Sequence, residues 1–264
     1  MSLRIASWNV NSVRLRLDHL LRFLTELAPD VICLQEIKCQ AAEFPADALA
    51  AAGYPFIRVQ GQKGWHGVAI ASRRPIYDGP TIDACREGHA RSVSAMVEGV
   101  EIHNFYVPAG GDVPDRELNP KFDHKLEFLA RLRDAFALRK QTEAIVVCGD
   151  LNVAPGEFDV WNHKIMSKVV SHTPIEIEAL EAVKSSLGFV DPIRELSPEP
   201  MKLASWWSYR AADFRASNRG LRLDHIWATP TLAARGPLAG AIHDHVRAWE
   251  RPSDHAPVTV DLAI

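Results

Sequence analysis

The stretch that decides the fold is Val31-Ile32-Cys33-Leu34-Gln35-Glu36, and its plan recurs in Ala144-Ile145-Val146-Val147-Cys148-Gly149-Asp150. Each stretch is an apolar run of the length of a buried strand, and each ends on an acidic residue. Each also follows a helical pattern of apolar residues: Leu17, Leu20, Leu21, Leu24 and Leu27 before the first, and Phe122, Leu126, Leu129, Leu132 and Phe136 before the second. The repeat of helix, strand and acid predicts a pseudo-duplicated α/β fold in which two sheets face each other and carry both acids to one rim.

Local signals set the ends of the predicted helices. Ser12 is suited to cap the first helix, and Pro29-Asp30 ends it. Thr173-Pro174-Ile175-Glu176 is a capping box with proline at the first helical position, and it predicts a helix that ends near Gly188. Between the two repeats, we expect strands at residues 67–72, 92–97 and 101–106. No Gly/Ser linker or low-complexity tract interrupts the sequence, so we expect a single domain over residues 1–264.

The composition narrows the class of protein. The chain carries 30 Lys and Arg against 33 Asp and Glu, a net charge of -3, so any nucleic-acid binding must rest on a local basic patch. The four cysteines, Cys33, Cys39, Cys85 and Cys148, lack the paired spacing of a zinc site, which favours reduced structural thiols and a cytoplasmic location. The first residues lack the layout of a secretory leader, and no apolar stretch approaches the roughly 18 residues of a membrane span. Neither secretion nor membrane insertion is expected.

Asn9 and Glu36 are candidates for a metal site. Trp8-Asn9-Val10-Asn11 ends the first predicted strand with two amides on the same side of the sheet. Taken alone, these are turn-forming asparagines, and Glu36 is a solvated charge at a strand end. Taken together, Asn9 and Glu36 suit the sparse oxygen shell of a hard cation such as Mg²⁺, with Mn²⁺ as the alternative.

Two further clusters offer catalytic groups. Asp150 and Asn152 lie two residues apart at a strand end, so both side chains fall on one face, where the carboxylate can activate a water and the amide can donate to a phosphoryl oxygen. A helix cap is the structural alternative for this pair. Ser253-Asp254-His255-Ala256-Pro257 supplies an imidazole, and Asp224 is a candidate to orient it, as a carboxylate does in hydrolytic triads.

Eight motifs run in order along the chain and cover essentially all of it: Trp8-Asn9-Val10-Asn11, Leu34-Gln35-Glu36-Ile37-Lys38, Trp65-His66-Gly67-Val68-Ala69, Tyr106-Val107-Pro108, Gly149-Asp150-Leu151-Asn152, Ser205-Trp206-Trp207-Ser208-Tyr209-Arg210, Asn218-Arg219-Gly220-Leu221-Arg222-Leu223-Asp224 and Ser253-Asp254-His255-Ala256-Pro257. In this set the chain resembles the exonuclease III type apurinic/apyrimidinic endonucleases of the endonuclease/exonuclease/phosphatase superfamily. The resemblance implies a four-layer α/β sandwich, with two packed mixed β-sheets flanked by helices. It also implies a monomeric, Mg²⁺-dependent phosphodiesterase that cuts duplex DNA 5′ to an abasic site and acts on 3′ ends.

The resemblance also implies roles for the reacting groups. It assigns Asn9 and Glu36, joined by Asp254, to the metal. It assigns Asp150 and Asn152 to the attacking water and the phosphate. The remaining implied catalytic residues are Tyr106, which would hydrogen-bond the scissile phosphate, and His255 with Asp224, which would stabilise the charge of the transition state.

The implied substrate-binding residues are Trp206, Leu221 and Leu223, which would pack against an extruded abasic sugar, and Arg210, which would fill the gap left in the duplex. An apolar slot is chemically reasonable because a deoxyribose without a base is small. The adjacent tryptophans, Trp206 and Trp207, also separate DNA-repair members of the superfamily from its lipid and inositol phosphatases. Considered without the flanking motifs, paired tryptophans are equally well explained by core packing.

The chain departs from the family pattern after Pro108. The family commonly has an amide-bearing residue there, whereas this chain has Ala109-Gly110-Gly111-Asp112, so one phosphate-contacting amide is missing. The loop is also acidic along the expected DNA path, at Asp112, Asp115 and Glu117, although basic residues follow at Arg116, Lys121 and Lys125. Leu221 stands where the animal branch has tryptophan and matches the bacterial branch.

Two other functions remain open at this stage. A related metal-dependent phosphoesterase could act on a phospholipid headgroup or an inositol phosphate, although the Trp206-Trp207 segment argues against it. A catalytically inactive DNA-binding relative is the second, and the presence of every expected acid, the histidine and the tyrosine argues against that.

Overall fold

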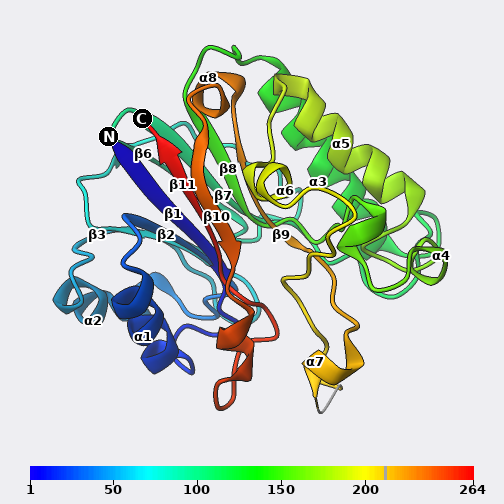
Figure 1. The fold of residues 1–264 in the computed structure, drawn as a ribbon, viewed down its shortest axis with the longest axis horizontal. Coiled ribbons are helices and arrows are strands. Elements are labelled where there is room, and N and C mark those ends of the chain that lie inside the picture. Colours follow the sequence, from blue (N-terminus) through cyan, green and yellow to red (C-terminus); the bar gives the residue numbers. More distant parts are fainter. Residues whose placement is uncertain (211–212) are drawn as a thin grey trace.

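Two β-sheets pack face to face in the computed structural model, which describes residues 1–210 and 213–264 (Figure 1). Among these residues, one sheet has six strands in the order β10-β11-β1-β2-β4-β3, and the other has five in the order β5-β6-β7-β8-β9. The strands of the first sheet are β10 (Pro237–Ile242), β11 (Val258–Ala263), β1 (Ser2–Asn9), β2 (Val31–Gln35), β4 (Val68–Ser72) and β3 (Phe56–Gln60). Those of the second are β5 (Tyr77–Asp78), β6 (Ser92–Val97), β7 (Val100–Tyr106), β8 (Ile145–Asp150) and β9 (Asp224–Ala228).

The two sheets contain matching parallel pairs. β1 and β2 are parallel, with Asn9 opposite Gln35, and α1 (Leu17–Leu27) connects them. β7 and β8 are parallel, with Tyr106 opposite Asp150, and α3 (Pro120–Ala137) lies in the equivalent connection. The other strand pairs described are antiparallel, so both sheets are mixed. The predicted pseudo-duplication is confirmed.

Alternation along the strands separates the layers of the fold. On β1, Leu3 and Ile5 point into an aliphatic core between the sheets, whereas Trp8 points toward α1. On β8, Cys148 faces the other sheet and Val147 faces α3. Fully burying one such large apolar side chain contributes about 1.5–3 kcal/mol, so the three apolar layers together provide most of the driving force for this arrangement. The expected four-layer sandwich is confirmed.

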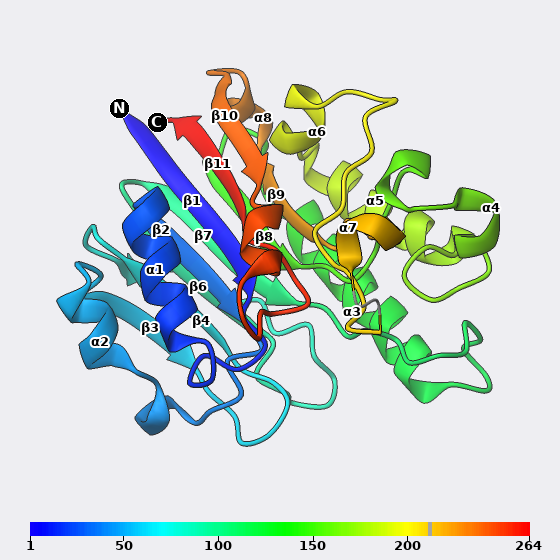
Figure 2. The same ribbon diagram turned by 60° about the horizontal axis from the view of Figure 1, so that its bottom comes forward.

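Helices cover the outer faces of both sheets. α1 and α2 (Ala46–Ala51) lie on the six-stranded sheet, and α3 and α5 (Pro174–Leu187) lie on the five-stranded sheet (Figures 1 and 2). The shorter helices are α4 (His163–Met166), α6 (Pro192–Leu196), α7 (Phe214–Ser217), α8 (Pro230–Ala233), η1 (Ala41–Glu43), η2 (Glu157–Asp159) and η3 (Asp244–Ala248). Within the two described ranges, no helix combines the length and the apolar character needed to cross a membrane.

The structure corrects one predicted helix end. Ser12 does not cap α1, because it has a φ of 85° and lies in the turn before Arg16, the N-cap residue of the helix. The carbonyl of Ser12 accepts a hydrogen bond from the Arg16 N–H at 3.2 Å, which closes that turn. The other predicted end is confirmed: the Glu176 carboxylate accepts the Thr173 N–H at 3.1 Å, and α5 ends before Gly188, which takes the left-handed conformation.

A polar layer lies between the aliphatic core and one edge of the sheets. Nε2 of Gln35, on β2, donates to Oδ1 of Asn104, on β7, at 2.6 Å and to Oγ of Ser7 at 3.1 Å. Nδ2 of Asn104 donates back across the interface to the carbonyls of Leu34 and Ala69 at 2.9 and 3.0 Å. Because these bonds are directional, they fix one sheet against the other at the edge where β1, β2, β7 and β8 end.

The three strands predicted for the middle of the chain are confirmed to within one residue, as β4, β6 and β7. All four cysteines are buried free thiols, as expected. Cys33 and Cys148 lie in the core between the sheets, where burial raises the pKa of the Cys33 thiol well above its ordinary value.

Candidate active site

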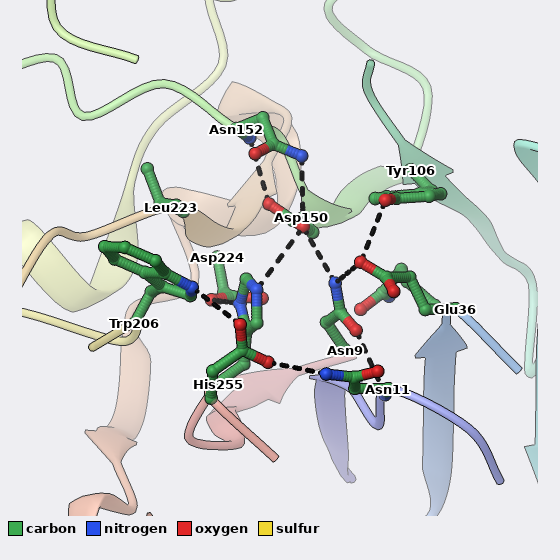
Figure 3. Close-up of polar contacts among 12 residues, drawn as sticks. Asn9, Asn11, Glu36, Tyr106, Asp150, Asn152, Trp206, Leu223, Asp224 and His255 are labelled. Atoms are coloured by element: carbon green, nitrogen blue, oxygen red, sulfur yellow. Dashed lines mark hydrogen bonds and ion pairs between the residues drawn. The ribbon is translucent and has the colours of Figure 1, made fainter. Parts of the chain in front are cut away.

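The residues singled out from the sequence meet at one rim between the two sheets (Figure 3). β1, β2, β7 and β8 end at this rim, and β9 and β11 begin there because each runs antiparallel to its neighbour. Side chains alternate along a strand, so Asn9 continues the inward row of Leu3 and Ile5, and Asp150 continues that of Cys148. The strand periodicity therefore directs the polar end residues of both sheets into one space.

Glu36 occupies the side of the rim that belongs to the first sheet. It follows β2 with a φ of 49°, a left-handed conformation that is unfavourable for a residue with a Cβ. Its Oε1 accepts hydrogen bonds from Nδ2 of Asn9 at 2.9 Å and from the hydroxyl of Tyr106 at 2.8 Å. Its Oε2 lies 2.9 Å from Nζ of Lys38. Three donors from both sheets thus hold this carboxylate in one orientation.

Asp150 and Asn152 occupy the opposite side of the rim. Oδ2 of the buried Asp150 accepts hydrogen bonds from Nδ2 of Asn9 at 2.9 Å and from Nδ2 of Asn152 at 3.1 Å. Burial is the main effect on the pKa of Asp150, and with the charge of Asp224 it raises that pKa to about 7 against the opposing charge of His255. A carboxylate with a pKa near neutrality is well matched to accept a proton from water.

The side chain of Asn152 is fully engaged in this structure. Besides its bond to Asp150, Nδ2 donates to the carbonyl of Val107 at 2.9 Å. The backbone N–H of Asn152 donates to Oδ1 of Asp150 at 3.0 Å, and the residue has a φ of 54°. Since both amide hydrogens are used, Asn152 orients Asp150, and donation to a phosphoryl oxygen requires one of these bonds to be exchanged.

His255 lies between two carboxylates. Its Nδ1 is 2.8 Å from Oδ2 of Asp224, and its Nε2 is 3.7 Å from Oδ2 of Asp150. Burial by itself lowers the pKa of His255, but the charges of Asp224 and Asp150 outweigh it and raise the pKa to about 10. The imidazole is therefore a cation at neutral pH, with Nδ1 committed to Asp224.

An apolar wall stands beside the acids. Leu221 and Leu223 are buried in a small cluster with Met166, and Trp206 borders it. Trp206 and Leu221 exchange backbone hydrogen bonds at 2.9 and 3.0 Å, which fixes the wall. The neighbouring Trp207 is different, since it is buried with its ring 5.1 Å from that of Phe214 and belongs to the core.

Asp254 links this wall to the end of β1. Its Oδ2 accepts a hydrogen bond from Nε1 of Trp206 at 3.0 Å, and its Oδ1 accepts one from Nδ2 of Asn11 at 2.9 Å. Asn11 in turn donates its backbone N–H to Oδ1 of Asn9 at 3.1 Å. Burial raises the pKa of Asp254, but the charge of His255 and these two donors outweigh it, so the net effect lowers the pKa and keeps the carboxylate ionised.

A cavity of about 580 Å³ is lined by the apolar wall and by Glu36, Tyr106, Asp150, Asn152, Asp254 and His255. Its charged lining residues are the acids Glu36, Asp112, Asp150 and Asp254 and the cations Arg219 and His255. Because the acids outnumber the cations and the pKa of Asp150 is raised, a divalent cation bound by oxygen ligands fits this rim.

A second possible ligand group lies deeper. Asp150, Asp224 and His255 offer ligand atoms within 4.8 Å of one another. A protonated imidazole is not a metal ligand, so the histidine does not serve a cation in this charge state. The donors that fit are the carboxylate oxygens.

Three basic residues discussed from the sequence lie at the edge of the site. Arg210 is exposed and apart from the hydrogen-bonded set, with its backbone N–H donating to Oγ of Ser208 at 3.2 Å. Lys125 was expected among the basic residues that offset the acidic loop, but this is wrong because its side chain is fully buried. Arg116 is also engaged, 2.8 Å from the carboxylate of Asp123.

Three residues of the site were not assigned from the sequence. Lys38 bridges Oε2 of Glu36 and Oδ1 of Asn11, at 2.9 and 2.6 Å. Ser205 donates its hydroxyl to Oδ2 of Asp224 at 2.6 Å, and Asn11 holds Asp254. Each belongs to one of the quoted motifs, so its proximity to a catalytic residue in the sequence was the available signal.

Comparison with known proteins agrees with this geometry. A model of the endonuclease/exonuclease/phosphatase family matches residues 6–255. Exodeoxyribonuclease III of Haemophilus influenzae is 32% identical, over 98% of this chain and 100% of that protein. The DNA repair nuclease APEX1 of Danio rerio is 30% identical, over 100% of this chain and 83% of that protein.

Solved structures extend the similarity to the fold. An AP endonuclease from Archaeoglobus fulgidus has a TM-score of 0.90 at 33% identity, over 98% of each chain. The 3′ phosphatase NExo from Neisseria, solved with a product DNA hairpin, has a TM-score of 0.89 at 32% identity, over 99% of this chain and 100% of that one. The likeness thus extends over nearly the whole chain, both sheets included.

Proposed function

The chain belongs to the endonuclease/exonuclease/phosphatase family, and we propose that it is a DNA repair nuclease. The proposed reaction is hydrolysis of the phosphodiester bond 5′ to an abasic site in duplex DNA. The proposal rests on two groups at the rim, with Nε2 of His255 3.7 Å from Oδ2 of Asp150. Asp150 is a carboxylate with a pKa of about 7, and His255 is an imidazolium with a pKa of about 10. A hydrolase of phosphate esters needs a base for water and a fixed positive charge for the phosphorane-like transition state. Both are present in one cavity.

In the proposed mechanism, Asp150 accepts a proton from the attacking water. Asn152 keeps the carboxylate aligned through the bonds described above. The Nε2–H of His255 stabilises the negative charge that develops on the phosphoryl oxygens, while Asp224 holds Nδ1 and preserves the charge. The hydroxyl of Tyr106 donates to a non-bridging oxygen of the scissile phosphate.

Metal binding completes the proposal. Glu36 and Asn9 are the proposed ligands, with Asp254 as a further carboxylate, and Mg²⁺ is the proposed ion with Mn²⁺ as the alternative. When bound, the ion supplies Lewis-acid stabilisation of a phosphoryl oxygen. The excess of acids in the cavity supports Glu36 and Asp254 as ligands, since their oxygens are hard donors. Oδ1 of Asn9 accepts the Asn11 N–H and its Nδ2 donates to Glu36 and Asp150, so Asn9 binds a cation only after its amide exchanges these bonds.

The apolar wall supports an abasic substrate. A sugar that has lost its base can rotate out of the duplex at low cost, and Trp206, Leu221 and Leu223 offer it an apolar surface. We place Arg210 at the gap left in the helix, in line with its exposure. Action on 3′ ends, as a 3′-to-5′ exonuclease or a 3′ trimming enzyme, is the second proposed activity, and the similarity to NExo supports it.

Oligomeric state, cellular compartment and domain organisation are also proposals. We propose a monomer that acts on duplex DNA in the cytoplasm, and we propose that the whole chain forms one catalytic domain. The core shared by both sheets supports the last point, and the four free thiols support a reducing compartment.

One experiment tests the activity. The protein and Mg²⁺ are incubated with a labelled duplex that carries one abasic site, beside an undamaged duplex with a recessed 3′ end, with EDTA as the metal-free control. Incision at the abasic site that EDTA abolishes is the expected result. Turnover of inositol phosphates or phospholipid headgroups without incision would support the other phosphoesterases of the superfamily, and DNA binding without any product would indicate an inactive relative.

A further inference from the structure

A buried ion pair lies directly beneath the second-sheet side of the rim. Lys125 on α3 and Glu176 on α5 contact each other through Nζ and Oε1, and both side chains are fully buried. Neither is among the groups proposed to touch substrate or metal. Replacing a buried ion pair by neutral side chains is often neutral or even stabilising, because removing two charges from water is costly. Stability alone is therefore a weak reason for the pair to be present.

The ammonium of Lys125 binds the two loops that carry the reacting groups. Nζ donates to the carbonyl of Asn152 at 2.7 Å, in the loop after β8, and to the carbonyl of Ala109 at 3.3 Å, in the loop after β7. The first loop follows Asp150, the last residue of β8, and the second follows Tyr106, the last residue of β7. A single buried cation thus connects the backbones of both loops.

The bond to Asn152 constrains a strained residue. Asn152 has a φ of 54°, and its backbone N–H and Nδ2 both hold the carboxylate of Asp150. Its carbonyl is in a buried residue, so without Lys125 it loses its charged partner. Relaxation of this turn would move the donors away from Asp150.

Glu176 fixes the position of Lys125. In a capping box the carboxylate accepts the N–H of the N-cap residue, here Thr173 at 3.1 Å, and Glu176 also accepts the Ser171 N–H at 2.9 Å. It also accepts the Thr173 hydroxyl at 2.6 Å, which leaves its orientation little freedom while it contacts Nζ. The capping box seen in the sequence is thereby tied to the catalytic rim.

We propose that Lys125 and Glu176 are positioning residues that set the loop after β8 against the loop after β7, and so align Asp150 and Asn152 with Tyr106. The functional consequence rests on the proposed roles of those three residues. The structural consequence does not, because it concerns the order of the two loops alone.

The test uses a double variant that keeps the core neutral. Lys125→Met alone leaves a buried carboxylate without its cation and is expected to be strongly destabilised. In Lys125→Met/Glu176→Gln no charge is left, and the glutamine oxygen can still accept the cap N–H groups. The matched control is Arg139→Met/Glu101→Gln, which removes the 2.7 Å ion pair at the other end of β7.

We expect the Lys125/Glu176 double variant to melt close to the wild type and to bind an abasic duplex with similar affinity, but to have a kcat about 10- to 100-fold lower, the loss typical of misplaced catalytic groups. Amide hydrogen exchange should speed up at residues 107–112 and 150–154 together. The Arg139/Glu101 control should keep its kcat and its exchange rates in both loops.

The outcomes separate the two proposals. Wild-type exchange rates in both loops of the Lys125/Glu176 double variant would overturn the positioning role, and so would a wild-type kcat in a properly folded protein. If the wild type does not cut abasic DNA but the two loops loosen together in the variant, the proposed function fails and the positioning role stands.

Discussion

Nδ1 of His255 lies 2.8 Å from Oδ2 of Asp224, and the same oxygen accepts the hydroxyl of Ser205 at 2.6 Å. The carboxylate is fully buried, so its charge acts on the imidazole through a poorly screened environment. The donor from Ser205 keeps Oδ2 in place, and the result is an imidazolium whose Nε2–H faces the cavity. This relationship gives the clearest prediction for catalysis.

His255→Ala should lower kcat on an abasic duplex on the order of a hundredfold or more, the effect of deleting one preorganised donor to a developing charge. DNA affinity should change little, because the group acts in the transition state rather than in ground-state binding. Asp224→Asn should lose less, since the imidazole remains but its pKa falls. Single-turnover rates and a separate binding titration measure both quantities, and a loss of affinity as large as the loss of rate would contradict the assignment.

Glu36→Gln should raise the Mg²⁺ concentration needed for half-maximal cleavage by at least about 10- to 100-fold, the loss seen when a partner of a metal ligand is removed. The substitution keeps an oxygen for Asn9 and Tyr106 but removes the charge that attracts the ion. Glu43→Gln is the control, because Glu43 is an exposed acid paired with Arg14. Calorimetric titration with Mn²⁺ checks the affinity independently of turnover. Full activity of the Glu36 variant at low Mg²⁺ would remove this residue from the metal site.

Trp206→Ala should slow incision at an abasic site by about 10- to 200-fold, the range for losing an apolar contact in a specificity pocket. Processing of a plain 3′ end should suffer much less, because no extruded sugar is involved. The indole also donates to Asp254, so Trp206→Phe, which keeps an aromatic ring and loses that bond, separates the two contributions. Equal losses on both substrates, with a lowered melting temperature, would mean that Trp206 is structural.

The fold was predictable because its signals are local and repeat. The two runs at Val31 and Ala144 each gave a strand with an acid at its end, and the period-two alternation of the strands carries Asn9 and Asp150 into the same space. The capping box at Thr173 was equally predictable from the sequence, since it depends on four consecutive residues.

The start of the first helix and the burial of Lys125 could not be predicted, because they depend on the three-dimensional path of the chain. Ser12 has the right chemistry for a cap, but a turn with a φ of 85° separates it from the helix. Lys125 follows acidic residues and reads as a surface charge, yet it lies on the inner face of α3 and reaches Glu176, 51 positions later in the chain. From the sequence alone such a lysine is expected at the surface, because burial of a charge is tolerated only when a specific partner is present, and Glu176 is distant in the sequence.

The free energy of unfolding at low pH tests a buried network of two acids, Asp159 and Asp191, and two arginines, Arg194 and Arg222, behind the apolar wall. Oδ1 of Asp159 accepts a hydrogen bond from Nε of Arg222 at 2.7 Å, and Oδ2 accepts one from Nη2 at 3.0 Å. Burial raises the pKa of Asp159, but the charges of Arg222 and Arg194 prevail and lower it from 3.8 to about 2. Because the folded-state pKa is depressed, the stabilisation is fully present above the unfolded value and is lost as the pH falls from about 4 to about 2.

Asp159 should therefore contribute about 2 kcal/mol to the loss of unfolding free energy across that range. Asp159→Asn should be less stable than the wild type at pH 7, because Arg222 loses a charged partner, and its stability should fall less steeply between pH 4 and pH 2. Urea unfolding at a series of pH values measures both. Asp123→Asn, which removes solvent-accessible ion pairs with Arg116 and Arg86, is the control and should change the acid slope much less, because water screens these pairs. An acid slope in Asp159→Asn equal to that of the wild type would show that this carboxylate does not titrate with folding, and the network would then have to be held by Asp191, which lies 2.6 Å from Nη1 of Arg222.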